Sequence, residues 1–271
     1  MAMRDAVQDA YGARAASSEP CGCSSESCCS GDSAPMKGEA ACCSSSEDSV
    51  SILPDYASED LSDAPQEAAE FSLGCGNPLA MADLKPGEVV LDIGSGGGLD
   101  SFLAARRVGP AGKVIGVDMT PAMLERARAS AQRTGIGNVE FRQGYAEAMP
   151  VEASTVDVIM SNCVINLTED KGQVFREAFR ALRPGGRLEV SDIVTSGALP
   201  VEAMEDRYSW AECISGALPE QEYLDLIAQA GFEAVQVRRK TNAGTLAGVE
   251  IYSAIVSAKK PAIGEPAGAC C

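Results

Sequence analysis

The chain has 271 residues, of which 45% are hydrophobic, so it can bury the core of one large domain. Its formal net charge of -17 argues against nucleic acid and anionic membrane surfaces as partners, because both would be repelled. The absence of histidine excludes a Ser-His-Asp or Cys-His catalytic pair and any zinc site that uses histidine.

The N-terminal part of the chain is polar and rich in cysteine. Residues 1–16 lack the apolar stretch of a signal peptide, and no later run is long and apolar enough to span a membrane. We therefore expect a cytoplasmic protein whose 11 cysteines are mostly reduced and serve metal binding or catalysis. Residues 17–49 have too little apolar bulk to order themselves, so we expect residues 1–50 to form a flexible Cys-rich segment.

Strand and helix patterns alternate through the middle of the chain. The alternation predicts an α/β fold with a mostly parallel, doubly wound sheet. Thr120-Pro121 begins one helix, because Thr caps it and Pro fits its first position. Another helix ends before Pro184-Gly185-Gly186. The expected strands are 89–93, 113–118, 138–141, 156–160 and 187–193, and helices are expected at 99–107, from 121 and around 174–182.

The C-terminal part is less regular. Residues 194–218 form an irregular stretch that contains Trp210 and Cys213. A helix is expected at 219–230 and closing strands at 233–239 and 249–256. The expected division of the chain is a flexible segment 1–50, a core 51–193, an insertion with helix and closing strands 194–260, and a flexible tail 261–271 that ends in Cys270-Cys271.

A glycine loop, Gly94-Ser-Gly-Gly-Gly98, follows the first strand, where ligands bind in sheets of this kind. Asp92 lies just before the loop, and Asp118 ends the next strand, where it can accept hydrogen bonds from a ribose diol. The loop departs from Gly-x-Gly-x-x-Gly, because Leu99 stands where the last glycine should be. The pattern indicates a nucleotide-type cofactor, with an NAD site and a purely structural loop as alternatives.

Three cysteines lie outside the cysteine-rich ends of the chain. Cys75 precedes the first strand, Cys163 follows the fourth strand, and Cys213 lies in the irregular stretch, a position typical of a substrate lid. Strand order places the end of the fourth strand beside the glycine loop, so Cys163 should face the cofactor. Core packing is the alternative for each cysteine, since free cysteine is among the most buried residue types. Three thiols around one pocket favour a soft, thiophilic substrate.

These cysteine-bearing segments resemble those of arsenite methyltransferases. The resemblance covers roughly residues 71–232, and the Asp-x-Gly-x-Gly-x-Gly loop with Asp118 is similar to the S-adenosylmethionine loop of class I methyltransferases. It implies a Rossmann-like class I methyltransferase fold, with a cofactor-binding core over 51–193 and an arsenic-binding insertion within 194–260. The matching segments are 72–78 (SLGCGNP), 117–121 (VDMTP), 161–167 (SNCVINL), 183–186 (RPGG), 212–213 (EC) and 230–232 (AGF).

The resemblance also assigns roles to residues. It implies that Cys163 and Cys213 bind trivalent arsenic and that Cys75 takes part in binding or in redox turnover. It implies an N-terminal cysteine that pairs with Cys75, for which Cys42 and Cys43 are both candidates. The cofactor positions that it implies, together with those of the glycine loop, are Asp92, Gly94, Gly96, Gly98, Asp118, Met119, Ala146, Glu147 and Asn162.

The implied activity is transfer of methyl groups from S-adenosylmethionine to arsenite and methylarsenite, giving methylated arsenicals for detoxification. A thiol reductant, glutathione or thioredoxin, would be the co-substrate, and we expect a monomer. Arsenite is uncharged near neutral pH, and its lone pair can attack a sulfonium methyl without a general base, which agrees with the absence of histidine. The alternatives are a class I methyltransferase for a small organic acceptor and a non-enzymatic thiol-rich metalloid-binding protein.

Overall fold

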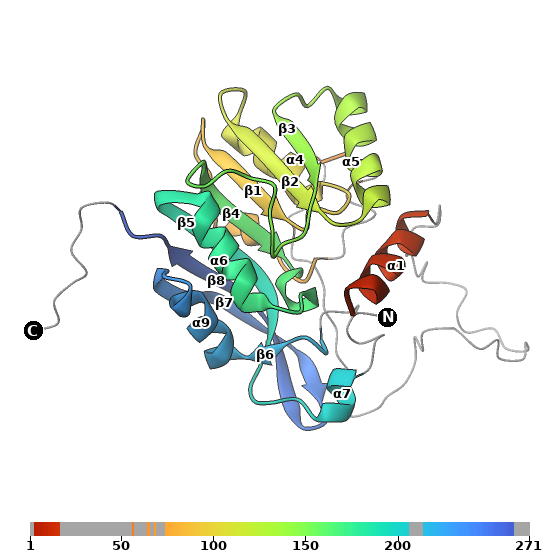
Figure 1. Cartoon of the computed structure of the whole chain (residues 1–271), viewed down its shortest axis with the longest axis vertical. Helices are drawn as coiled ribbons and strands as arrows, with labels where there is room; N and C mark the ends of the chain where they lie inside the picture. The colour runs from red at the N-terminus through yellow and green to blue at the C-terminus, as the bar shows by residue number, and fades with distance from the viewer. Residues whose placement is uncertain are drawn as a thin grey trace, which may run out of the picture.

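The architecture is one sheet with helices on both faces (Figure 1). The computed structural model describes residues 3–16, 56, 64–65, 68, 74–205 and 214–262. Within these ranges the sheet has eight strands in the order β3-β2-β1-β4-β5-β8-β7, and β6 pairs with β5. Strands β1 to β5 are parallel, whereas β8 runs antiparallel to both β5 and β7. This order confirms the predicted mostly parallel, doubly wound sheet and creates a switch point between β1 and β4.

The elements have the following bounds. The strands are β1 (Val89–Ile93), β2 (Lys113–Asp118), β3 (Val139–Gln143), β4 (Val156–Asn162), β5 (Leu182–Thr195), β6 (Leu218–Pro219), β7 (Glu233–Leu246) and β8 (Val249–Lys259). The helices are α1 (Met3–Ala16), α4 (Leu99–Val108), α5 (Pro121–Thr134), α6 (Lys171–Ala181), α7 (Val201–Glu205) and α9 (Glu220–Gln229), with short 3₁₀ helices η1 (Pro78–Ala80) and η2 (Ile165–Leu167). None of these helices is long and apolar enough to cross a membrane.

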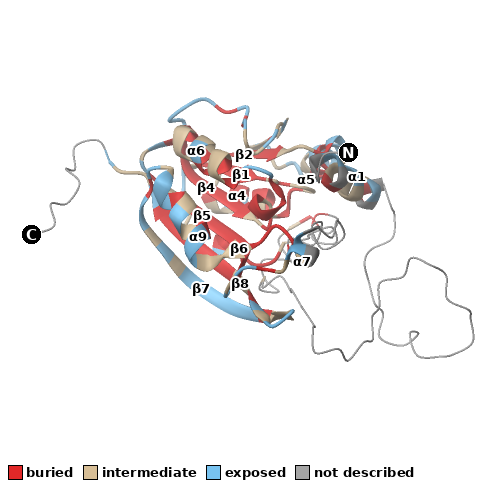
Figure 2. Cartoon of the chain, turned by 60° about the horizontal axis from the view of Figure 1, so that its bottom comes forward, coloured by how far each residue is buried: buried red, intermediate tan, exposed pale blue. Residues whose placement is uncertain are grey.

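Alternating side chains of the central strands supply two separate cores. Val90, Val114 and Val158 pack with α4 and α5, whereas their chain neighbours Leu91 and Ile159 pack with α6 and α9. Because successive strand residues point to opposite faces, one continuous apolar run serves both helical layers. Figure 2 shows the result, with the central strands buried and β7 largely exposed at the edge of the sheet.

Strand β5 begins five residues earlier than predicted, at Leu182 instead of residue 187. The segment around Pro184 and Gly185 was expected only to end a helix. In the structure Gly185 N donates to Lys260 O, and Lys260 N donates to Gly186 O. The extension thus pairs with Val156 of β4 at Leu182 and with Lys260 at Gly185 and Gly186, and a local pattern does not reveal either partner.

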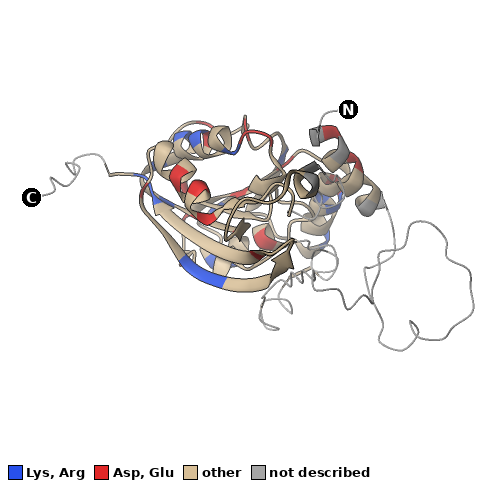
Figure 3. Cartoon of the chain, turned by 90° about the horizontal axis from the view of Figure 1, so that it is seen from below, with Lys and Arg blue, Asp and Glu red and all other residues tan. Residues whose placement is uncertain are grey.

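The exposed edge strand β7 carries a basic run, Arg238-Arg239-Lys240, visible as the blue segment of the outer strand in Figure 3. Within the described sheet, β7 pairs with one strand alone, β8. Charged side chains on an edge strand discourage pairing with other chains, because association would bury them. Although the chain is acidic overall, its edge strand β7 carries a cluster of positive charge.

Helix α1 is absent from the sequence-based expectations, which made residues 1–50 flexible. Val7, Tyr11 and Ala15 are spaced four residues apart and form an apolar stripe, and Val7 is 2% exposed. The helix contacts α5 (Figure 1), where Arg126 Nε donates to Ala15 O at 2.6 Å. The expectation is therefore wrong for residues 3–16, while residues 17–49 and 263–271 lie outside the described ranges.

Candidate active site

A cavity opens where β1, β2 and β4 end, the edge at which ligands bind in such sheets. Eight of the nine predicted cofactor positions line it. The exception is Gly98, which begins α4 with φ 92° and packs under Phe102 and Phe141. The eight are Asp92, Gly94, Gly96, Asp118, Met119, Ala146, Glu147 and Asn162; side chains that the sequence reasoning did not select also line the cavity, including Val7, Tyr11, Asp100 and Tyr145.

Asp118 ends β2 with its carboxylate held in place by the glycine loop. Gly96 N donates to Oδ2 at 2.9 Å, and Thr120 N donates to Oδ1 at 2.8 Å. Burial raises the pKa of Asp118 above its ordinary value. The Thr120 side chain also forms a hydrogen bond to Asp118, so about one of the four acceptor positions of the carboxylate remains open. A fixed carboxylate with an open acceptor position suits a ribose hydroxyl.

Two more acids, Asp92 and Asp100, line the same cavity. Burial, then the charge of Asp100, raises the pKa of Asp92 to about 8, although Ser101 Oγ donates to it at 2.6 Å. Burial also raises the pKa of Asp100, whose oxygens accept hydrogen bonds from Tyr56 Oη at 2.7 Å and Asn162 Nδ2 at 3.1 Å. A cationic ligand would relieve this repulsion. The cavity therefore fits a ligand that has both a positive charge and a ribose hydroxyl, as S-adenosylmethionine does.

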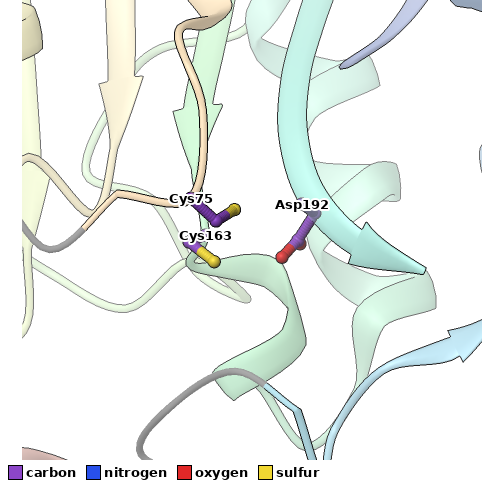
Figure 4. Close-up of side chains that lie close together, drawn as sticks. All are labelled: Cys75, Cys163 and Asp192. Atoms are coloured by element: carbon purple, nitrogen blue, oxygen red, sulfur yellow. The ribbon is translucent and has the colours of Figure 1, made fainter. Parts of the chain in front are cut away.

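Beside the cavity, two buried thiols meet a buried carboxyl group (Figure 4). The sulfurs of Cys75 and Cys163 and a carboxylate oxygen of Asp192 all lie within 4.8 Å of one another, and the three residues are 2%, 4% and 1% exposed. Cys163 directly follows β4 and has φ 60°, a left-handed conformation that is uncommon outside glycine. Its N–H donates to Ser191 O at 2.7 Å, which fixes the turn.

The Gly-Cys-Gly segment around Cys75 lies against the ends of β4 and β5. A Cβ on Gly74 would lie 2.2 Å from Asn162 Nδ2, and one on Gly76 would lie 2.1 Å from Ser191 Oγ. Ser253 Oγ, on β8, donates to Cys75 O at 2.6 Å. The glycines therefore let the backbone approach closely enough to bring Cys75 to Cys163.

Asn162 connects this thiol cluster to the cofactor cavity. Its Oδ1 accepts from Cys75 N at 3.1 Å, and its Nδ2 donates to Gly76 O at 2.9 Å. The same Nδ2 donates to Asp100 Oδ2 at 3.1 Å, and it lies 2.8 Å from Tyr56 Oη. One amide group therefore contacts both the segment that carries Cys75 and the acid that lines the cavity.

Asp192 was part of a predicted strand but was not selected as a site residue. Burial raises the pKa of Asp192 to about 7, although the hydrogen bonds that it accepts lower it. These come from Tyr223 Oη, Asn166 N and Ile193 N, each at 3.1 Å. The available signal was an acid followed directly by two apolar residues, Ile193 and Val194, near the end of a predicted strand, since a buried carboxyl group is costly unless it has partners or a function.

The remaining cysteines lie outside the described residues, among them Cys213 and the N-terminal candidates Cys42 and Cys43. Trp210 and the final pair Cys270-Cys271 lie outside as well. The structure therefore brings together two of the three predicted pocket thiols, and the position of Cys213 stays a prediction. Within the described chain the cluster offers two thiols and one carboxyl group, fewer than the four ligands of a structural zinc site.

Residues 84–231 match a family described as a methyltransferase domain. The chain is 41% identical over 249 residues to an arsenite methyltransferase of Halobacterium salinarum, an alignment that covers 88% of this chain and 63% of that protein. It is 36% identical to human arsenite methyltransferase over 189 residues, covering 66% of this chain and 50% of the human protein. The chain thus spans about half to two thirds of the length of these curated relatives.

Among solved structures, the chain resembles an arsenic(III) S-adenosylmethionine methyltransferase from Chlamydomonas reinhardtii. The TM-score is 0.69 at 35% sequence identity, and the match covers 77% of this chain and 74% of the algal chain. The two chains are therefore similar in sequence as well as in fold.

We predict that Gly76→Ala displaces the segment that carries Cys75, because the new methyl group would overlap Ser191 Oγ. The free energy of unfolding should fall by about 1–3 kcal/mol, as for other overpacked sites. Alkylation of Cys75, followed by mass spectrometry, should be faster than in the wild type. Gly137→Ala is the control, since a Cβ there has no neighbour within 4 Å. Unchanged Cys75 alkylation in the Gly76 variant would contradict the prediction.

The stability effect of Asp92→Asn should depend on pH. Asp92 has a pKa of about 8 in the folded chain and about 3.9 when unfolded, so the folded state binds more protons between these values. The free energy of unfolding therefore falls as pH rises through this window. Asp92→Asn removes the effect and should stabilise the ligand-free protein at pH 8 by more than about 1 kcal/mol relative to pH 5. Denaturant unfolding measures this, with exposed Asp225→Asn as control; a pH-independent gain would refute it.

Proposed function

The chain belongs to the arsenite methyltransferase family of S-adenosylmethionine-dependent enzymes, and from this premise we propose that it methylates trivalent arsenic held by its own thiols. The observation that carries the proposal is the pair of buried thiols, Cys75 and Cys163, beside a cavity lined by acids. A methyltransferase for an organic acceptor would give two buried, adjacent thiols no chemical task.

The cavity residues would hold S-adenosylmethionine, whose sulfonium group supplies an electrophilic methyl. Asp118, positioned by Gly96 N, would bind a ribose hydroxyl, and Asp92 and Asp100 would face the positive charges. Met119, Ala146, Glu147 and Asn162 would complete the contacts. Apolar side chains of α1, Val7 and Tyr11, line the same cavity and limit the access of water.

The thiols would capture arsenite by exchange. Each As–S bond replaces an As–O bond, and the thiol proton leaves with the displaced hydroxide as water. No net charge is buried by this exchange, so a dry thiol cluster in an acidic protein can accept the substrate. Thiolates are also better ligands for a soft centre than oxygen groups are.

We propose Cys213 as the third thiol. The family resemblance motivates this role, and the described structure supports it at the next residue. Ile214 is 8% exposed and packs in the apolar cluster that contains both Cys75 and Cys163. The chain therefore enters the neighbourhood of the thiol cluster directly after Cys213.

Turnover also needs electrons. Attack by the arsenic lone pair on a methyl group raises arsenic from the trivalent to the pentavalent state, so two electrons must return it for another cycle. Oxidation of Cys75 and an N-terminal cysteine, Cys42 or Cys43, to a disulfide releases two electrons and two protons. A thiol reductant, glutathione or thioredoxin, would then reduce the disulfide.

The proposal has a cellular setting. Reduced thiols require a reducing compartment, so we place the enzyme in the cytoplasm, acting as a monomer with thioredoxin as its redox partner. Residues 51–193 would bind the cofactor and residues 194–260 would complete the arsenic site. The methylated arsenicals would be products of detoxification.

We expect purified protein to convert arsenite to methylated arsenicals in the presence of S-adenosylmethionine and a thiol reductant, as measured by arsenic speciation. Cys163→Ser should lower the rate on the order of 10²-fold, as expected when a reacting atom loses its position. Cys270→Ser, in the C-terminal tail, is the matched control for loss of one thiol. Absence of methylated arsenic from the wild type would reject the function, and undiminished methylation by Cys163→Ser would reject the ligand role.

Methylarsenite should depend less on Cys75 than arsenite does. Methylarsenite has two exchangeable positions, so two thiols, Cys163 and Cys213, suffice to bind it. We therefore expect Cys75→Ser to retain a larger fraction of wild-type kcat/KM on methylarsenite than Cys163→Ser or Cys213→Ser do. The comparison uses single-turnover assays with reductant in excess, and equal losses in the three variants would count against this division of roles.

A further inference from the structure

Asp192 projects from β5 toward the two sulfurs of the thiol cluster (Figure 4). It is 1% exposed, and its oxygen lies within 4.8 Å of both Cys75 and Cys163. A buried carboxyl group usually faces a cation or a full set of hydrogen-bond donors. Here it faces two thiols, which are weak donors.

The hydrogen bonds of Asp192 leave room for one more partner. Tyr223 Oη and Asn166 N donate to Oδ2, and Ile193 N donates to Oδ1. These three donors occupy three of about four acceptor positions of a carboxylate. Lys171, the cation whose charge acts on Asp192, donates instead to the carbonyl groups of Asn166 and Thr168.

The same three donors hold the carboxyl group rigidly. Tyr223 is fully buried, and its ring packs edge-on against Phe175 at a centroid distance of 5.5 Å. Two of the donors are backbone N–H groups, which cannot rotate away. The carboxyl group is therefore held with one oxygen within 4.8 Å of both sulfurs and is not free to turn elsewhere.

The substrate presents a group that fits this position. Trivalent arsenic has three substituents, and arsenite keeps one hydroxyl after two thiols have bound. We propose that Asp192 recognises this remaining arsenic hydroxyl by a hydrogen bond and holds it beside Cys75, the thiol that displaces it. A carboxylate would accept the bond and a carboxylic acid could donate one to the hydroxyl oxygen, so either protonation state serves. In the exchange the As–O bond breaks, an As–S bond to Cys75 forms, and the Cys75 proton leaves with the hydroxide as water.

This role makes Asp192 a positioning residue that distinguishes the substrates of successive methylations. Methylarsenite bound by two thiols has a methyl group at the third position and no hydroxyl for Asp192. The carboxyl group should therefore favour the first methylation over the second. The inference rests on the proposed function, because it concerns the arsenic that the thiols hold.

The test is the ratio of kcat/KM for arsenite to kcat/KM for methylarsenite. Asp192→Ala should lower kcat/KM for arsenite about tenfold or more, the range for a lost hydrogen bond to a charged group. The same variant should lower kcat/KM for methylarsenite by less than about threefold, the size of effect expected from a small structural change near the site. Asp192→Asn, whose amide can still bond a hydroxyl, should recover part of the lost ratio. Tyr223→Phe, which removes one of the three donors that hold the carboxyl group, should shift the ratio in the same direction as Asp192→Ala and by less.

Equal losses on both substrates in Asp192→Ala would overturn the inference and leave Asp192 a purely structural group. Binding of S-adenosylmethionine by each variant checks that it is folded. Should Asp192→Ala fail that check, Asp192→Ser takes its place under the same criteria, because its shorter side chain does not reach the sulfurs. If the wild type methylates neither arsenical, the proposed function fails as well. If the wild type methylates both and the ratio does not change, the inference alone fails.

Discussion

The side chain of Asn162 is the contact on which the arrangement of the site depends. It fixes the backbone of Cys75 and Gly76 and at the same time donates to Asp100, which lines the cofactor cavity. Cys163 is the next residue in the chain. The two thiols and the cavity are therefore related through one amide at the end of β4, and a shift of that amide would move all three.

Electrostatics explain why the cavity is suited to a cationic ligand. Burial raises the pKa of Asp92, Asp100 and Asp118. Keeping these acids buried at neutral pH therefore lowers the free energy of unfolding of the ligand-free chain. A positively charged ligand converts this cost into binding energy, because it restores the charged form of the acids. The thiol cluster next to the cavity differs, because the proposed arsenic substrate is uncharged and would bring no charge into it.

The local chain pattern could predict much of this arrangement. The apolar run Val89–Ile93 followed by glycines predicts a strand and a ligand loop, because tight turns at that point admit few other residues. Cys163 could be placed near the loop, because parallel strands end at one edge of the sheet. Helix α1, the early start of β5 and the role of Asp192 could not be predicted, because each depends on partners far away in the chain: Arg126, Lys260 and the two thiols.

The sequence by itself determined the order of strands and helices, the cofactor loop and the candidate thiols. These follow from periodicity, from the positions of glycine and proline, and from residue types whose chemistry is specific. Only the tertiary structure decided that Cys75 and Cys163 meet at a buried carboxyl group, and that Gly74 and Gly76 are needed for the close approach. The physical reason is that packing brings Cys75, Cys163 and Asp192 together from three separate segments, and no local pattern contains the distances between segments.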